Sequence, residues 1–334
     1  TEIYTLSLHD ALPISFIKLT GICCLYLFLN SMSVRAQTPT EIEPWWPHPL
    51  WGANDQAGGS NWITPAKILS SLATVQTGKV YELGYPYEAT MPLVGNRKFE
   101  LTLPLLPSGD SLGPDLVYNV ETVTSQIGQV GTQFDGPGHI GKRITMIDGS
   151  TQDVYYNGVT SEEMESPTGL RKNGVEQVKP YITTGILIDI AAAKEVASLP
   201  AGYVVTLEDV QEALQRQGIA EEDIQPGDAL LFNFGWWRKW PDPVVLGNGP
   251  GIGEEVANWV IEKQASMVGS DVITDEATAW VVHHRLMLQH GIWNLEFMNF
   301  EKLLADQLYR FLFIFTPLRF KGATGSPGRP IAIG

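Results

Sequence analysis

The chain has 334 residues, of which 44% are hydrophobic and 10% aromatic, and its formal net charge is −15 at pH 7. This composition is sufficient for a large apolar core, and at roughly 100–200 residues per domain the length allows one large domain or two. The acidic balance argues against nucleic acids and anionic membrane surfaces as partners, because both favour basic patches on a protein.

The first residues have the composition of a leader. Residues 1–15 do not begin with Met and resemble translated sequencing-adapter sequence, so we expect them to be non-native. Residues 16–36 combine a basic residue, an apolar run and a small-x-small ending, which predicts a secretory signal peptide. Both cysteines, Cys23 and Cys24, lie in it, so the expected domain at 37–334 would contain neither a disulfide nor a thiolate. These features predict a periplasmic or secreted protein.

An aromatic loop is expected next, at residues 43–62, where Trp, Pro and Gly dominate. It contains His48, which could be a packed or a surface histidine, and Trp62, which we expect near a substrate pocket. A second Trp group, Trp236, Trp237 and Trp240, could belong to the core, to a subunit interface or to a ligand pocket.

Periodicity and capping residues predict helices and strands that are mixed within one domain. The clearest helix has Thr206 as its N-cap, Asp209 three residues later and Gly218 as its stop. Near-continuous apolar runs indicate buried strands. In chain order, the expected elements are a helix (64–78), strands (79–83, 117–123 and 185–191), a helix (206–218), a strand (229–234), a helix (254–264), a strand (266–272), a helix (277–289) and strands (292–297 and 308–317).

Polar residues are concentrated in the stretch 127–142, IGQVGTQFDGPGHIGK. If it is extended as far as Asp135, side-chain alternation places Gln129, Gln133 and Asp135 on one face. The Gly-Pro-Gly sequence that follows predicts a tight turn. This turn could bring the imidazole of His139 back toward the Asp135 carboxylate.

Two carboxylates, Asp135 and Glu296, lie in otherwise apolar predicted strands. A buried carboxylate is costly unless it is paired or bound to a cation. Together with His139 and the distant His284 they could form a divalent metal site of mixed nitrogen and oxygen ligands. The alternative is structural: Asp135 caps the turn and His139 packs beneath it.

Two sequence blocks resemble the metal-dependent cyclase-like hydrolases, a family that includes bacterial kynurenine formamidase and isatin hydrolase. QVGTQFDGPGH at 129–139 is similar to the signature His-x-Gly-Thr-His-x-Asp-x-Pro-x-His, with Gln129 and Gln133 in place of the first two histidines. The second block, a His twelve residues before a Glu, matches His284 and Glu296. The resemblance extends over nearly all of 37–334, and Gln in the Gly-Thr-Gln-x-Asp block is interpreted as a subfamily trait.

The resemblance implies an α/β fold, a swivelling β/β/α single domain, and a site that binds manganese or zinc. Gln is a weaker and harder ligand than His, so its presence shifts the preference from zinc toward manganese. The implied roles are catalytic for His139 and Glu296, metal-ligating for Gln129, Gln133, Asp135, His284 and Glu296, and pocket-lining for His283, Trp62 and Arg97.

The implied function is a metal-dependent hydrolase of small cyclic or aryl amides, or lactones, with His139 as general acid/base. The expected assembly is a homodimer or homotetramer. The alternative is a small-molecule binding protein, or a non-hydrolytic cyclase or dehydratase without tightly bound metal.

Overall fold

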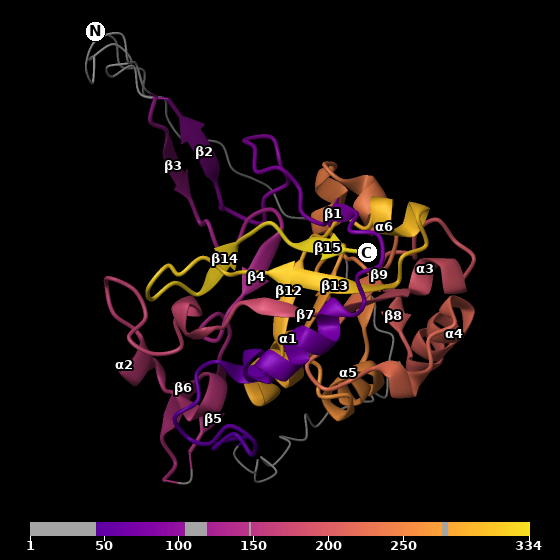
Figure 1. The fold of residues 1–334 in the computed structure, drawn as a ribbon. Helices are drawn as coiled ribbons and strands as arrows, with labels where there is room; N and C mark the ends of the chain where they lie inside the picture. Colours follow the sequence, from indigo (N-terminus) through magenta and orange to yellow (C-terminus); the bar gives the residue numbers. More distant parts are fainter. Residues whose placement is uncertain (1–44, 104–118, 147, 276–279) are drawn as a thin grey trace, which may run out of the picture. The chain divides into compact units, whose positions relative to one another are not determined.

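A computed structural model describes residues 45–103, 119–146, 148–275 and 280–334, and Figure 1 shows their fold. All of them lie in the second of the two units into which the chain divides, Pro44–Gly334. The predicted leader at 1–36 lies outside the described residues. Within the described ranges, no helix is long and apolar enough to cross a membrane.

A nine-stranded sheet forms the centre of the structure (Figure 1). Its strands, in spatial order, are β1 (Val80–Glu82), β15 (Ile331–Ile333), β13 (Arg310–Phe315), β7 (Tyr181–Asp189), β9 (Ala229–Asn233), β11 (Met267–Ser270), β12 (Trp293–Glu296), β4 (Gln133–Asp135) and β14 (Gly325–Pro327). The four strands β7, β9, β11 and β12 are parallel neighbours, and antiparallel strands extend the sheet on both sides.

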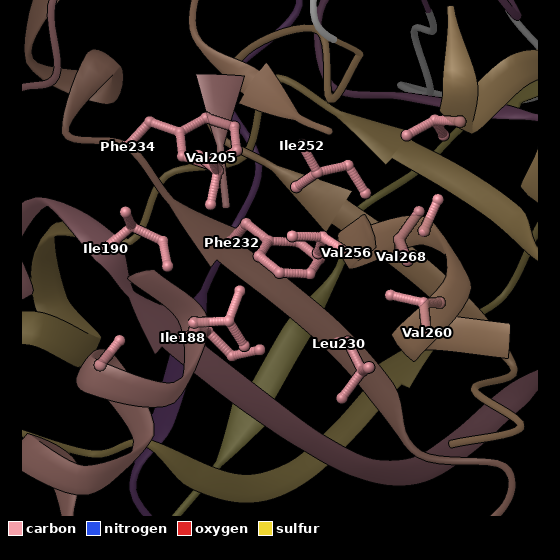
Figure 2. Close-up of a cluster of buried hydrophobic side chains, with 14 of the residues drawn as sticks. Ile188, Ile190, Val205, Leu230, Phe232, Phe234, Ile252, Val256, Val260 and Val268 are labelled. Atoms are coloured by element: carbon pink, nitrogen blue, oxygen red, sulfur yellow. The ribbon is translucent and has the colours of Figure 1, made fainter. Parts of the chain in front are cut away.

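The parallel strands are buried on both faces, as their apolar sequences predict. Alternation along β7 places Ile186 and Ile188 in one hydrophobic core and Leu187 in the other. Figure 2 shows the first of these cores, in which Phe232 of β9 lies beside Val256 of the helix α5 (Glu254–Glu262). The sheet therefore lies between two hydrophobic cores, which hold its strands in place.

Helices cover this sheet, with short paired strands at its periphery. The helix α1 packs against β7 and β13, and α4 packs against β7 and α5 (Figure 1). The α-helices are α1 (Pro65–Leu72), α2 (Ser161–Met164), α3 (Ile190–Ala193), α4 (Leu207–Gln217), α5 (Glu254–Glu262) and α6 (Glu301–Ala305). The 3-10 helices are η1 (Gly58–Trp62), η2 (Tyr156–Gly158), η3 (Val175–Gln177), η4 (Glu221–Asp223), η5 (Trp236–Lys239) and η6 (Pro243–Leu246), and η7 (Val282–Gln289) is a π-helix. The two-stranded sheets pair β2 (Phe99–Thr102) with β3 (Thr122–Ser125), β5 (Lys142–Thr145) with β6 (Thr151–Val154), and β8 (Val204–Val205) with β10 (Gly251–Ile252).

Capping residues set the helix boundaries where the sequence predicts them. The Thr206 side chain accepts a hydrogen bond from the backbone N–H of Asp209, and Gly218 closes the helix at φ 68°. Thr64 caps α1 in the same manner. Of the Trp group, Trp236 lies in the core and donates from Nε1 to the carbonyl of Leu199 at 2.9 Å.

Two predicted strands differ from the structure in their extent. The strand expected at 185–191 begins at Tyr181, and its last residues form α3. The strand expected at 117–123 corresponds to β3, which begins at Thr122, ends at Ser125 and pairs with β2. In both cases tertiary pairing overrides the local pattern.

The polar stretch before β4 is not extended throughout. Gly131 has φ +60°, so the chain bends before the strand begins at Gln133. The expectation that Gln129 and Gln133 share one strand face is therefore wrong. The bend at Gly131 breaks the two-residue repeat on which it depended.

Candidate metal centre

The register of β4 against β12 brings the polar blocks together. Gln133 lies opposite Glu296, and Asp135 lies opposite Asn294. Thr132 fixes this arrangement by donating from Oγ1 to the carbonyl of Phe297 at 2.7 Å. Two sequence segments about 160 residues apart thus meet as neighbouring strands.

The turn after β4 returns the chain toward Asp135, as predicted. The backbone N–H of His139 donates to the carbonyl of Gly136 at 3.0 Å. The Nε2 atom of His139 then lies 3.8 Å from Oδ1 of Asp135. A Cβ on Gly138 would lie 2.8 Å from the backbone oxygen of Asn173, so this turn has no room for a larger residue.

The third side chain of the site comes from η7. Nε2 of His283 lies 3.5 Å from Oδ2 of Asp135, and His283 Nδ1 is hydrogen-bonded to the Asp275 carboxylate. Asp275 also accepts the backbone N–H groups of Val282 and His283. Asp275 therefore satisfies the first backbone N–H groups of η7 and also orients the His283 imidazole.

The group Asp135, His139 and His283 has the donors that a divalent metal needs. One possible ligand atom from each lies within 4.8 Å of the others. Ligands about 2.1 Å from a tetrahedral ion lie about 3.4 Å apart. His283 Nε2 lies 3.5 Å from Oδ2 of Asp135 and His139 Nε2 lies 3.8 Å from Oδ1, so each imidazole faces a different oxygen of the carboxylate at about this spacing. Oδ2 of Asp135 is fully buried and accepts no hydrogen bond from the described residues. Such an oxygen is costly unless a cation compensates it, so the residues fit a metal ion.

Gln129 and Gln133 orient carboxylates through their amide nitrogens. Nε2 of Gln129 donates to Oδ1 of Asp135 at 2.8 Å, and Nε2 of Gln133 donates to Oε2 of Glu296 at 3.1 Å. Asn294 holds the other oxygen of Glu296 at 2.9 Å. The structure thus places both Gln residues beside the site, and their role as metal ligands stays a prediction.

The two adjacent histidines have different surroundings. His283 reaches Asp135 and also lines a cavity, as expected for a pocket residue, whereas Nε2 of His284, expected to be a ligand, lies 3.1 Å from Nζ of Lys142. The reason is local: the Asp275 carboxylate fixes the first turn of η7, and the wide π-helical turn changes which residues share a face.

Two further predicted pocket residues have different positions. Arg97 lies at the edge of the site, where Nη1 donates to the carbonyl of Gln129 at 3.0 Å. Trp62 lines a separate cavity of about 210 Å³ with His48 and His290. It is therefore absent from the cavity that His283 lines. His48 is 5% exposed, so the packed interpretation holds.

Burial and the neighbouring charges determine the ionisation of the site. Burial opposes ionisation of Asp135, but the His139 and His283 imidazoles offset it and lower its pKa. Burial lowers the pKa of His139, against the opposing effect of Asp135. Although burial lowers the pKa of His283, the Asp135 and Asp275 carboxylates raise it well above its ordinary value. Burial and Asp135 raise the pKa of Glu296 to about 8. The site is thus a buried environment in which the carboxylates stabilise a positive charge that lies between them.

Sequence reasoning missed Asp275, the residue that fixes His283. An Asp a few residues before a predicted helix is an N-terminal signal, and Asp275 precedes the expected helix at 277–289. Residues 276–279 lie outside the described ranges, so the helix start expected there is not seen.

Comparisons with known proteins place this chain in a family. The family model described as putative cyclase matches residues 81–285. A solved structure of a novel cyclase is 29% identical over 85% of this chain and 98% of its own, with a TM-score of 0.75. Isatin hydrolase A from Ralstonia solanacearum is 24% identical over 81% of this chain and 98% of its own (TM-score 0.53). Isatin hydrolase A from Labrenzia aggregata, bound to benzyl benzoate, is 18% identical over 80% and 97% (TM-score 0.55).

These two hydrolases share the fold, and the predicted cyclase-like α/β fold is confirmed. The search of curated proteins finds no match. The family match covers more than half of the chain, and it includes the turn that carries Asp135 and His139 and the start of η7. This chain belongs to the putative cyclase family.

Proposed function

We propose that this protein is a metal-dependent hydrolase of small cyclic or aryl amides, or of lactones. The observation that carries the proposal is the buried group Asp135, His139 and His283, with a carboxylate oxygen that no described residue satisfies. Two structures with this fold are isatin hydrolases by name, so the fold accommodates hydrolysis of a small ring compound.

The proposed cofactor is one or more divalent ions, manganese or zinc. Asp135 and His283 would hold it, and we propose Glu296, Gln129 and Gln133 as further ligands, because both Gln side chains are hydrogen-bonded to the carboxylates of the two blocks. When bound, such an ion supplies an activated water and polarises the carbonyl group of the substrate. The carboxylate oxygens of Glu296 keep lone pairs beyond those that its two amide partners use.

His139 has two possible roles that exclude each other. A ring nitrogen bound to metal cannot also accept a proton. The His139 side chain is 19% exposed to solvent, against 6% for His283, whose other nitrogen is held by Asp275. We assign His139 the acid/base role: it takes the proton of the attacking water and passes it to the leaving group.

Two variants separate these roles. His139→Ala should retain the metal but lose most turnover, by about 10²–10⁴-fold, whereas Asp135→Ala should lose both. The measurement is metal content by elemental analysis, with turnover on a panel of aryl amides and lactones with and without chelator. A wild-type protein that contains no divalent metal, or that hydrolyses nothing in the panel, would favour the small-molecule binding or non-hydrolytic alternative.

We also propose a periplasmic or secreted location, supported by the leader sequence, and a homodimeric or homotetrameric assembly. Cell fractionation of the full-length protein tests the first. Light scattering on the purified protein tests the second, and a monomer at micromolar concentration would contradict it.

A further inference from the structure

A second feature of η7 is a cavity of about 300 Å³ beside the candidate metal centre. His283 belongs to both, because its ring faces Asp135 and also lines the cavity. Ligand pockets typically occupy about 300–1,000 Å³, so this one has room for a single aromatic ring with a small substituent. A molecule in this cavity would lie next to the proposed reacting centre.

Most of the cavity wall is apolar. Ile140, Leu288 and Trp280 contribute hydrophobic surface. The Trp280 ring lies edge-on to the His283 ring, with the centroids 5.4 Å apart, and the residue is 51% exposed. An exposed indole beside a cavity offers stacking surface to a planar ligand.

The cavity wall also includes a cation, Lys142. Lys142, the first residue of β5, is half-buried and its Nζ lies 3.1 Å from Nε2 of His284. An ammonium group has three donors, and this contact uses one of them. No carboxylate of the described residues lies within 4.0 Å of Nζ. The adjacent Arg143, by contrast, is exposed and bound to Asp153 at 2.7 and 2.9 Å.

We propose that this cavity binds the ring of an aryl substrate that carries an anionic group, and that Lys142, positioned by His284, binds that group. The apolar walls select the ring and the lysine selects its charge. The chain as a whole carries a net charge of −15, which repels anions. The half-buried ammonium group of Lys142 at the cavity wall therefore gives an anion one specific place to bind. The inference rests on the proposed function for the statement that the ligand is a substrate.

Binding of a matched pair of probes tests the site. Benzenesulfonate is ionised at all working pH values and is a weak metal ligand, and methyl phenyl sulfone is its neutral counterpart. Calorimetry on the full-length protein, with and without chelator, should show benzenesulfonate binding at least about tenfold tighter in both conditions. Equal affinities for the two probes in the wild type would overturn the proposal.

Substitutions of two adjacent residues of β5, Lys142 and Arg143, provide the control. Lys142→Met should abolish the preference for the sulfonate, and Lys142→Arg should retain most of it. Arg143→Met removes a charge from the neighbouring position and should leave the preference intact. A preference that persists in a folded Lys142→Met protein, or that disappears in Arg143→Met, would contradict the assignment to Lys142.

Metal content distinguishes this inference from the proposed function. If the protein binds a divalent metal but binds the two probes with equal affinity, the anion site is refuted and the hydrolase proposal is not. A sulfonate preference in a protein that binds no divalent metal would refute the hydrolase and leave the anion site intact.

Discussion

The carboxylate of Asp275 accepts a hydrogen bond from Nδ1 of His283, which leaves Nε2 of the same ring facing Asp135. The same carboxylate accepts the backbone N–H groups of Val282 and His283. One side chain therefore sets the start of η7, the tautomer of the imidazole and its direction. Carboxylates behind ligating histidines tune many metal sites in this way.

Asp275→Asn tests this relationship. The amide cannot accept the Nδ1 proton as strongly as the carboxylate, so the ring loses its fixed orientation. We expect metal affinity to fall about 10–100-fold, measured by competition with a chromophoric chelator. The exposed Glu100→Gln is the control and should match the wild type. An unchanged affinity in folded Asp275→Asn would show that the pair does not orient a ligand.

Gln133→Met tests whether the Gln side chain stabilises the buried Glu296 carboxyl. The substitution removes the donor 3.1 Å from Oε2 of a residue that is 3% exposed. We expect the free energy of unfolding to fall by about 1–3 kcal/mol, measured by urea denaturation. Gln211→Met removes an exposed Gln–Glu hydrogen bond of the same length, and should cost less than about 0.5 kcal/mol. Equal losses in the two variants would contradict the buried role.

Gly131→Ala tests the bend before β4. The residue has φ +60°, and a Cβ there would lie 3.1 Å from the Tyr87 ring and 3.2 Å from Sδ of Met91. We expect a loss of about 1–2 kcal/mol from the backbone, with a further loss from crowding. Gly78→Ala has φ +73° and open space around its Cβ, so it isolates the backbone contribution. If both variants lose the same stability in thermal unfolding, the crowding at Gly131 is negligible.

The pH dependence of stability tests the burial of His290. Burial, with contributions from Arg285 and His48, lowers its pKa to about 4 from 6.5. On acidification the unfolded chain therefore binds the proton first, and the stabilisation present above pH 6.5 is lost as the pH falls toward 4. The contribution is at most about 3 kcal/mol. His290→Gln should flatten the stability curve between pH 6.5 and 4, and parallel curves for wild type and variant would contradict the assignment.

Local sequence signals predicted those parts of the fold that local chemistry determines. Thr206, Asp209 and Gly218 define the ends of α4 because their side-chain and backbone bonds lie within the helix itself. The turn that places His139 beside Asp135 was predictable for the same reason. The resemblance implied that Asp135 and Glu296 belong to one site, and the pairing of β4 with β12 that joins their two segments is contained in no local pattern.

The sequence does not reveal that His283, and not His284, lies beside Asp135. This placement depends on the wide turn of η7 and on Asp275, both of which are tertiary features. The orientation of Gln129 depends likewise on the positive φ of Gly131 and on the position of Asp135. The spacing of twelve residues before Glu296 selects His284, and it carries no information on the conformation that places His283 beside Asp135.

We propose that Asp135 and His283 hold a divalent metal and that His284 does not. The most direct test is the metal-to-protein ratio, by elemental mass spectrometry, of His283→Gln and His284→Gln purified side by side with the wild type. We predict that His283→Gln loses the metal and that His284→Gln retains the wild-type ratio. Retention in His283→Gln together with loss in His284→Gln would contradict the site described here.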